Sequence, residues 1–379
     1  MLFFTGLIVV AAASPLLEQR SDPYASAKAA LRQYQSTYEK NTLKSLSGSC
    51  KYPTVRKAWG NLAASEKKDY IKAVKCLAKT PTKLSLSKVP GARNQIDDFA
   101  WTHIENTDII HVSAFLLPWH RHYIWLYEQT LRNDCGYKGS LPYWKWEHFA
   151  DDQKVSPVFQ AGDDSFGTNG VYVPHGAVTN TYVGLPAPGI SSVRPPGNGG
   201  GCVTNGAFGN QTGWTLNLGP VSLNTTKNAA NNTYGQQFNP RCLNRDFLQE
   251  ISSENLNYTA LVSLLSSPEM SIFHPQLELG VHRAAHTYIG TEAFDFFSSP
   301  LDPVFFLLHS QIDRIWAIWQ GQDLATRQNA VDGTLTAFNL PPSANGTLQS
   351  VMHFGVLDSD KTIGFAASPT KNGYCYIYQ

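Results

Sequence analysis

The stretch 302-DPVFFLLHSQIDRIWAIWQG-321 carries the clearest helix signal in the chain. Asp302 can cap a helix, Pro303 suits the first helical position, and the final glycine suits the exit. Within it, His309 and Asp313 are four residues apart and therefore share one face of the helix. A carboxylate at that position could orient the imidazole of His309 through a hydrogen bond. This face of an otherwise apolar helix is therefore a candidate polar site.

A second pair of histidines lies in 279-LGVHRAAHTYIG-290, within a helix that the pattern predicts from Pro275 to Tyr288. His282 and His286 are four residues apart, so both imidazoles project from one face and could share a metal ion. A lone histidine is most often a structural or surface residue, and a pair on one helix is a weak signal. The interpretation depends on whether other histidines complete the set.

Three further histidines lie in 103-HIENTDIIHVSAFLLPWHRHYIWLYEQTLR-132. His111 and His120 are nine residues apart, which would place them on opposite sides of one straight helix. Pro118 is expected to separate two helices, one predicted over 97–111 and the next beginning around Trp119. Histidines from the two helices can then converge. The two candidate sets are His103, His111 and His120, and His282, His286 and His309.

Helix signals dominate the remaining sequence as well. Residues 24–40 and 65–80 show the apolar spacing of helices, and the second runs from a serine cap to a proline stop. Between 162 and 241, Gly, Pro, Asn, Ser and Thr dominate, which predicts a long irregular excursion with short strands. This segment could instead be a linker between two domains. The fold class is therefore mainly α, with long irregular loops and a few short strands.

Size and charge exclude some classes of function. The chain has 379 residues, 42% of them hydrophobic, and a formal net charge of +1. That length suggests two or three domains but allows a single large one. No basic run or stripe is present, so a nucleic acid is not expected as a partner.

Three features predict a secreted protein. Residues 1–20 contain an apolar run and then small residues, which is the pattern of a signal peptide with a possible short pro-segment. No other apolar run is long enough to cross a membrane. The six cysteines are even in number and scattered, which favours disulfides, and Cys50 with Cys76 is the pair that we expect. Five sequons predict N-glycans, three of them in or beside the irregular excursion. They are Asn210, Asn224, Asn231, Asn257 and Asn345.

The donor types narrow the metal. Three neutral imidazoles in each set, without cysteine or carboxylate, suit copper or zinc. Zinc hydrolases of the H-E-x-x-H type need Glu after the first histidine, whereas Arg283 stands there. Two three-histidine sets on neighbouring helices favour a pair of copper ions that react with dioxygen.

At this point the chain resembles the tyrosinase, catechol oxidase and haemocyanin group of type-3 copper proteins, and most closely short secreted fungal members. The resemblance rests on 103-HIENTDIIHVSAFLLPWHRHYIWLYEQTLR-132, 282-HRAAH-286 and 302-DPVFFLLHSQIDRIWAIWQ-320, in that order. It implies a four-helix bundle in which each histidine set binds one copper ion. It also implies one catalytic domain over 21–379, with 162–241 as a loop excursion and without the C-terminal lid domain of many relatives.

The resemblance suggests roles for other residues too. The C-terminal 374-YCYIY-378 looks like the Tyr-x-Tyr of the family, and Arg32 is a candidate partner for it. Glu278 matches a glutamate that orders a water near the substrate. Phe296 resembles an aromatic gate over the second copper, although it could equally be a core residue. Thr287, which follows His286, is a candidate substrate contact.

Several positions depart from the family pattern. Thr107 stands at one place where a cysteine bonded to a copper ligand might lie, so such a thioether is not expected. Leu308 replaces the histidine that often precedes the last ligand, and Lys145 replaces an aspartate in 142-PYWKW-146, for which we have no account. Arg283 stands where members that hydroxylate monophenols often have Asn.

The implied activity is therefore oxidation of o-diphenols to o-quinones, with reduction of dioxygen to water. A guanidinium cannot accept the phenol proton, so Arg283 disfavours monophenol hydroxylation, although it could attract a phenolate or a substrate carboxylate. Monophenol hydroxylation and o-aminophenol oxidation remain alternatives. A haemocyanin-like oxygen carrier and a dizinc hydrolase are the more distant ones.

Overall fold

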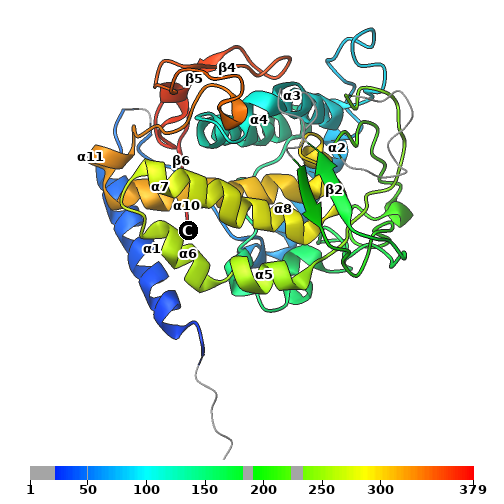
Figure 1. Cartoon of the computed structure of the whole chain (residues 1–379), viewed down its shortest axis with the longest axis horizontal. Helices are drawn as coiled ribbons and strands as arrows, with labels where there is room; N and C mark the ends of the chain where they lie inside the picture. The colour runs from blue at the N-terminus through cyan, green and yellow to red at the C-terminus, as the bar shows by residue number, and fades with distance from the viewer. Residues whose placement is uncertain (1–21, 49, 182–190, 223–233) are drawn as a thin grey trace, which may run out of the picture.

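The computed structural model describes residues 22–48, 50–181, 191–222 and 234–379. The predicted mainly α class is confirmed, because helices make up most of the regular structure and the strands are short (Figure 1). The helices are α1 (Ala25–Ser45), α2 (Ala64–Leu77), α3 (Gln95–Ile110), α4 (Leu116–Cys135), α5 (Gln249–Asn255), α6 (Tyr258–Leu265), α7 (Met270–Gln276), α8 (Arg283–Ile289), α9 (Thr291–Phe294), α10 (Val304–Gln322) and α11 (Leu324–Arg327). The strands are β1 (Thr54–Arg56), β2 (Val178–Thr181), β3 (Ser191–Arg194), β4 (Val351–Met352), β5 (Lys361–Thr362) and β6 (Tyr376–Tyr378).

Helix α10 lies at the centre of the fold and packs against α1 and α4 (Figure 1). It is buried from Val304 to Gly321, as expected of a helix that is apolar on nearly every side. Asp302 caps it as predicted, since its Oδ1 accepts from the Val304 N–H at 3.0 Å. Gly321 does not end the helix, which runs on to Gln322. A Cβ there would lie 2.9 Å from the Tyr38 Cα, so the glycine lets α1 approach closely.

The break between α3 and α4 is confirmed, with shifted ends. Asn94 caps α3 by accepting from the backbone N–H groups of Ile96 and Asp97. The helix α3 ends at Ile110, and α4 begins at Leu116 rather than around Trp119. Pro118 therefore lies in the first turn of α4, where a missing N–H leaves no hydrogen bond unmade.

The helix predicted from Pro275 is different in the structure. It starts earlier, at Met270, and Pro275 lies inside α7. Residues Leu277–His282 then form a wider, π-type turn with a non-helical Gly280 at φ −93° and ψ −105°, before α8 begins. A proline cannot donate to the preceding turn, and kinks of this kind commonly follow from such a defect.

The first described strand of the chain, β1, pairs in parallel with its last strand, β6. Thr54, Val55 and Arg56 of β1 lie opposite residues 376, 377 and 378 of β6. The predicted Cys50–Cys76 disulfide is wrong, because this pairing brings Cys50 to Cys375 and the packing of α2 on α4 brings Cys76 to the end of α4. The disulfides are Cys50–Cys375, Cys76–Cys135 and Cys202–Cys242.

The Gly- and Pro-rich segment has the predicted short strands. Strands β2 and β3 form an antiparallel hairpin, in which Asn180 lies opposite Ser192. Of the predicted glycosylation sites, Asn210 and Asn345 are exposed, whereas the Asn257 side chain caps α6 by accepting from Ala260. Asn224 and Asn231 lie outside the described residues, as does the predicted signal peptide.

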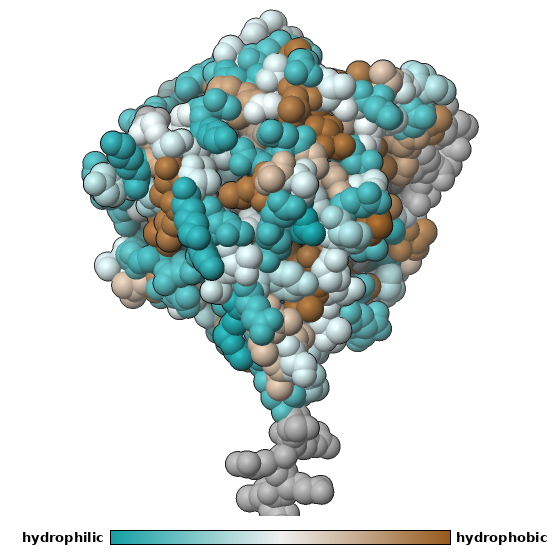
Figure 2. Space-filling model, turned by 90° about the vertical axis from the view of Figure 1, so that its left-hand side faces the viewer, coloured by the Kyte–Doolittle hydropathy of each residue, from teal (hydrophilic) through white to brown (hydrophobic). Residues whose placement is uncertain are grey.

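A helix that spans a membrane must be both long and apolar. Among the residues that the structure describes, no helix is long and apolar enough to cross a membrane. The face that carries α1 and α11 shows small hydrophobic groups set among hydrophilic residues (Figure 2). Such a mixture is typical of a face in contact with water.

Candidate metal centre

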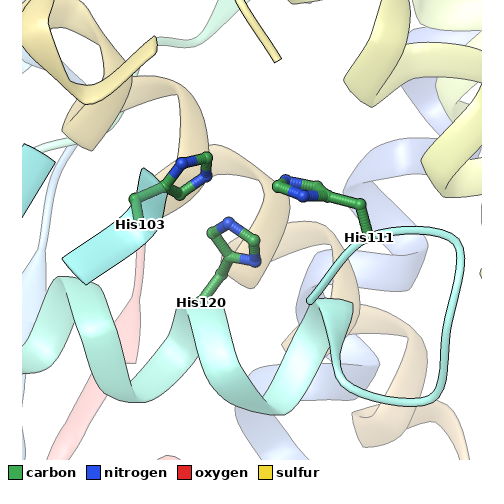
Figure 3. Close-up of side chains that lie close together, drawn as sticks. All are labelled: His103, His111 and His120. Atoms are coloured by element: carbon green, nitrogen blue, oxygen red, sulfur yellow. The ribbon is translucent and has the colours of Figure 1, made fainter. Parts of the chain in front are cut away.

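The first histidine set converges from three consecutive elements (Figure 3). His103 comes from α3, His111 follows the last turn of α3, and His120 lies one turn into α4. All three are buried, and their ring centroids lie 5.0 to 5.5 Å apart. One nitrogen of each ring lies within 4.8 Å of the other two, which is close enough for one metal ion. The chain turns between α3 and α4, so His111 and His120 can point to the same place from two different elements.

The second set comes from the kinked α7–α8 helix and from α10. His282 is the last residue of the π-type turn, His286 lies in α8, and His309 lies in α10. Their candidate nitrogens also lie within 4.8 Å of one another, and the Nε2 atoms of His286 and His309 are 3.3 Å apart. Both predicted sets are therefore brought together by the fold.

The two sets face each other. The rings of His120 and His309 stack with centroids 4.2 Å apart, and those of His111 and His282 are 6.3 Å apart. Phe305 lies between the sets, with its centroid 4.1 Å from that of His309. The sequence reasoning missed Phe305, although its position one helical turn before His309 could have identified it.

Backbone carbonyls fix the tautomers of four of the histidines. Nδ1 of each ring lies 2.6 to 3.2 Å from a carbonyl oxygen, which can only accept, so Nδ1 carries the proton. The pairs are His103 with Phe297, His111 with Thr107, His120 with Leu116, and His286 with Ala293. The Nε2 lone pairs are consequently free to point into the centre between the rings.

Burial keeps all six imidazoles neutral. Desolvation lowers the pKa of His103 to about 3 and that of His286 to about 4. Desolvation, and then the neighbouring imidazoles, hold the pKa values of the other four well below the usual range. Neutral imidazole is the form that binds a metal ion.

Three buried ring nitrogens have no hydrogen-bond partner within the described structure. They are Nε2 of His120, Nε2 of His282 and Nδ1 of His309. Leaving such groups unpaired in the interior costs free energy unless something else binds them. The donor set, its neutrality and the free Nε2 atoms of His120 and His282 together fit two metal ions, each held by three imidazoles.

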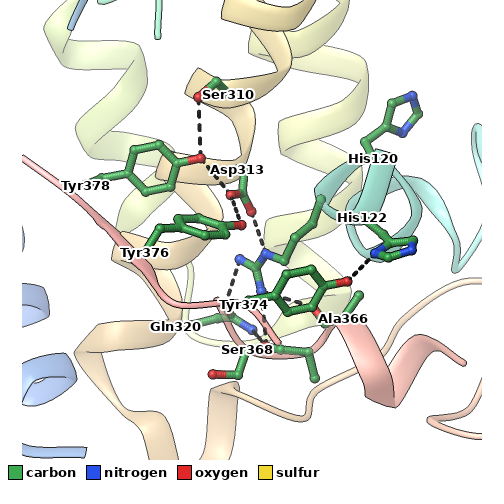
Figure 4. Close-up of polar contacts among 12 residues, drawn as sticks. His120, His122, Ser310, Asp313, Gln320, Ala366, Ser368, Tyr374, Tyr376 and Tyr378 are labelled. Atoms are coloured by element: carbon green, nitrogen blue, oxygen red, sulfur yellow. Dashed lines mark hydrogen bonds and ion pairs between the residues drawn. The ribbon is translucent and has the colours of Figure 1, made fainter. Parts of the chain in front are cut away.

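Asp313 does not orient His309, so that prediction is wrong. Its Oδ1 accepts from Arg121 Nε at 2.5 Å, and its Oδ2 accepts from the hydroxyls of Tyr376 and Tyr378 at 2.7 Å each (Figure 4). The residue shares a helix with His309 but turns its carboxylate toward the C-terminal strand. It therefore ties α10, the helix of His309, to Arg121 of α4 and to the C-terminal strand.

The predicted partner of the C-terminal tyrosines is also different. Arg56 of β1, not Arg32, lies over the Tyr376 ring, with its guanidinium carbon 3.6 Å from the centroid. It donates to the Tyr378 hydroxyl at 2.9 Å and pairs with the buried Glu128 of α4. The residue Arg56 was missed because nothing local relates residues 54–56 to residues 376–378.

A cavity of about 60 Å³ opens beside the histidines and is lined by His111, His282 and His286 among others. Glu278 is buried in its wall, where its Oε1 accepts from the Val112 N–H at 2.5 Å and its Oε2 lies 3.4 Å from His274 Nε2. The contact with His274, one turn earlier in the chain, was not predicted.

The other predicted substrate contacts fall in different places. Arg283 lines the cavity and is exposed to solvent. Phe296 also lines the cavity, but its ring lies 4.5 Å from that of His111, beside the first set, whereas the resemblance placed it over the second. Thr287 is not among the residues that line the cavity, and its hydroxyl donates to the Arg283 carbonyl within α8. Its role as a substrate contact stays a prediction.

Comparisons with known proteins agree with this geometry. Residues 93–322 match the family model described as the common central domain of tyrosinase. The chain is 36% identical to tyrosinase P of Aspergillus terreus over 337 residues, covering 87% of this chain and 93% of that protein. It is 37% identical to an N-acetyl-6-hydroxytryptophan oxidase of Emericella nidulans over 351 residues, covering 86% and 92%.

A solved structure is similar over almost the whole length. It is a polyphenol oxidase variant from Thermothelomyces thermophila, 34% identical, with a TM-score of 0.81 and coverage of 94% of this chain and 96% of that one. The fold, the two facing histidine sets and these similarities lead to one conclusion. The chain belongs to the tyrosinase family of copper oxidoreductases.

Proposed function

We propose that this protein is an o-diphenol oxidase. Its two histidine sets would each hold one copper ion, and two catechols would be oxidised to two o-quinones while one dioxygen is reduced to two waters. The observation that carries the proposal is a pair of three-histidine sets that face each other beside a cavity, with five of the six imidazoles buried and His286 partly so. The family membership identifies the class of reaction, and the residues around the cavity bear on the substrate.

When bound, a pair of copper ions in such a site supplies the redox chemistry between a diphenol and dioxygen. The chain must then bind the ring, exclude bulk water and receive the hydroxyl protons. Glu278 is the group that we assign to proton transfer, through a water, because it is a carboxylate in the cavity wall. The Val112 N–H holds one of its oxygens in place.

Two other residues would select the ring. Phe296 presents an aromatic face in the cavity beside His111, which favours flat rings that can stack on it. Arg283 offers only N–H donors and a positive charge, so it can attract a phenolate or a carboxylate but cannot take a proton from a monophenol. We therefore place diphenol oxidation ahead of monophenol hydroxylation.

Other reactions compete with this proposal. Tyrosinase activity and o-aminophenol oxidation use the same centre, and relatives named as a tyrosinase and as an oxidase of a hydroxylated tryptophan support keeping both. A reversible oxygen carrier would use the same six histidines without turnover. A dizinc hydrolase would use them with another metal.

The test is a turnover assay on protein purified with the metal it acquires in its own host. Metal analysis should find copper at two ions per chain, and 4-tert-butylcatechol should yield the quinone while two catechols are consumed per dioxygen. Replacing His309 by Ala should abolish turnover. The matched control is His353→Ala, an exposed histidine that does not line the cavity, which should keep wild-type rates.

Each alternative has its own result. Binding of dioxygen without quinone would identify a carrier and refute the oxidase. Zinc in place of copper would refute the copper centre. Parallel rates on tyrosine, tyramine, catechol and o-aminophenol would then rank the phenols.

We also propose that the protein is exported and works outside the cell as one catalytic domain over residues 21–379. Three disulfides are stable in an oxidising compartment, which supports export. Recovery of the mature chain from culture medium, with a processed N-terminus near residue 21, is the expected result.

A further inference from the structure

One wall of the cavity comes from the β2–β3 hairpin, which no motif singled out. Asn180 of β2 and Ser192 of β3 lie opposite each other in the hairpin and both line the cavity. The hairpin is fixed to the histidine-bearing helix by the buried Arg194. Its Nε donates to the Thr287 carbonyl of α8 at 2.7 Å, and its Nη1 donates to Asp246 at 2.5 Å.

The Asn180 side chain is held in one orientation. Its Nδ2 donates to the carbonyl oxygen of Phe294 in α9. A carbonyl can only accept, so the NH₂ end of the amide must face Phe294 and the oxygen must face the other way. The orientation is therefore set by hydrogen-bond chemistry.

The opposite end of this amide has nothing to bind. Asn180 is 3% exposed, and its Oδ1 is a buried atom without a hydrogen-bond partner within the residues that the structure describes. Buried acceptors of this kind are nearly always paired in folded proteins. The free atom belongs to a cavity-lining residue, which is where a bound molecule could satisfy it.

The other acidic and basic groups of the cavity wall do not offer the same function. Asp295 also lines the cavity, but its carboxylate accepts from backbone N–H groups, including those of Val221 and Phe297. Arg283 can only donate, and Glu278 carries the proposed proton transfer. Asn180 Oδ1 is thus a neutral hydrogen-bond acceptor in the cavity wall that could bind a donor group of the substrate.

We propose that Asn180 is a specificity residue whose Oδ1 accepts a hydrogen bond from an N–H or O–H group on the ring substituent of the substrate. This inference rests on the proposed oxidase activity and narrows its substrate class. The preferred substrates would be diphenols with a donor-bearing side chain, such as an amide, rather than diphenols with a bare alkyl chain. The ring stacks near Phe296 while the substituent reaches the hairpin wall.

A matched pair of substrates tests the donor alone. N-acetyldopamine and its ester analogue, 2-(3,4-dihydroxyphenyl)ethyl acetate, have the same ring and nearly the same shape, but only the amide has an N–H. The wild-type enzyme should show a kcat/KM about fivefold higher for the amide, the rate equivalent of one net hydrogen bond. The rate on 4-methylcatechol measures the oxidase activity separately.

Variants then assign the preference to the atom. In Asn180→Leu, and in the smaller Asn180→Ala, the amide-to-ester ratio should fall to about 1, because neither side chain has an acceptor atom. The control is Thr179→Val, the preceding residue of β2, whose side chain points to the other face of the strand and which should keep the wild-type ratio.

The outcomes separate the two proposals. No quinone from any catechol would refute the oxidase, whereas turnover with equal rates on amide and ester would refute only the role of Asn180. An amide-to-ester ratio that is unchanged in Asn180→Leu would also refute the role of Asn180. Should the Leu variant fail to fold, an amide preference that is retained in a folded Asn180→Ala would overturn the proposal, and its loss would support it.

Discussion

Replacing Asp313 by Ala should destabilise this protein more than any substitution on its surface. The carboxylate is 3% exposed and accepts from the Arg121 guanidinium and from two tyrosine hydroxyls. Arg121 is itself fully buried, and its other described acceptors are neutral, the carbonyls of Ala366 and Ala367 and the side chain of Gln320. The substitution would therefore leave a buried positive charge without its counter-ion.

The magnitude follows from these contacts. Removing one partner of a buried ion pair costs about 3–5 kcal/mol, because the remaining charge stays desolvated. Each of the two tyrosine hydroxyls that loses its acceptor adds about 1–3 kcal/mol. The expected loss is at least about 5 kcal/mol, which is comparable with the whole stability of many domains, at about 5–15 kcal/mol.

Urea unfolding of the metal-free protein, followed by tryptophan fluorescence, measures this loss without a contribution from bound metal. Tyr376→Phe and Tyr378→Phe each remove one hydrogen bond and should cost about 1 kcal/mol. Asp360→Ala is the matched control, because this carboxylate is 56% exposed and pairs with the exposed His353. It should change the stability by less than about 0.5 kcal/mol.

An Asp313→Ala variant that is within about 1 kcal/mol of the wild type in its free energy of unfolding would contradict this expectation, since an unpaired buried charge costs more than that. Should no folded Ala variant be recovered, the double variant Tyr376→Phe/Tyr378→Phe still tests the network. A combined cost near zero would mean that these hydroxyls do not support Asp313.

Three further predictions concern the substrate, pH and the disulfides. Arg283→Asn should raise the ratio of tyramine to catechol turnover about tenfold, the rate equivalent of one hydrogen bond to a charged group. An unchanged ratio would mean that Arg283 does not select between monophenols and diphenols. In the metal-free protein, the pKa values of His103 and His286 are lowered to about 3 and about 4, whereas a histidine in the unfolded chain has a pKa near 6.5. Below pH 6.5 the unfolded state therefore binds more protons than the folded state. The free energy of unfolding is therefore highest above pH 6.5 and decreases as the pH falls, by up to about 1.4 kcal/mol per pH unit for each histidine. A urea midpoint that does not change between pH 7.5 and 5.5 would contradict this. Replacing Cys50 and Cys375 by Ala should lower the free energy of unfolding by about 2–5 kcal/mol, because the bond closes a loop of 325 residues, and an unshifted midpoint would argue against that role.

Local patterns predicted much of the site. The cap and apolar run of α10 are short-range signals, and they placed His309 correctly on a buried helix. Pro118 predicted the break that lets His103, His111 and His120 converge. Helical spacing then grouped His282 with His286. In each case the controlling interactions lie within about one or two helical turns.

The remaining features depend on contacts between distant residues. Nothing in residues 50–56 indicates a pairing with residues 375–378, so the disulfide partner of Cys50 and the role of Arg56 were both missed. Pro275 was interpreted as a helix start, because proline is common in the first turn, whereas the structure has it inside α7 and just before a π-type turn. Asn180 lies in an irregular segment without a motif, and only the packed hairpin shows that its oxygen is free.

The pairing of β1 with β6 also sets the order of events during synthesis. A ribosome makes residues 103–120 first and residues 282–309 much later, but the strand that buttresses Asp313 comes later still. Until residues 376–378 have left the exit tunnel, Arg56 and Asp313 lack the two tyrosines between them. A nascent chain therefore carries all six histidines before it has a scaffold rigid enough to aim them. We expect the centre to take up metal only after residues 376–378 have packed against Arg56 and Asp313.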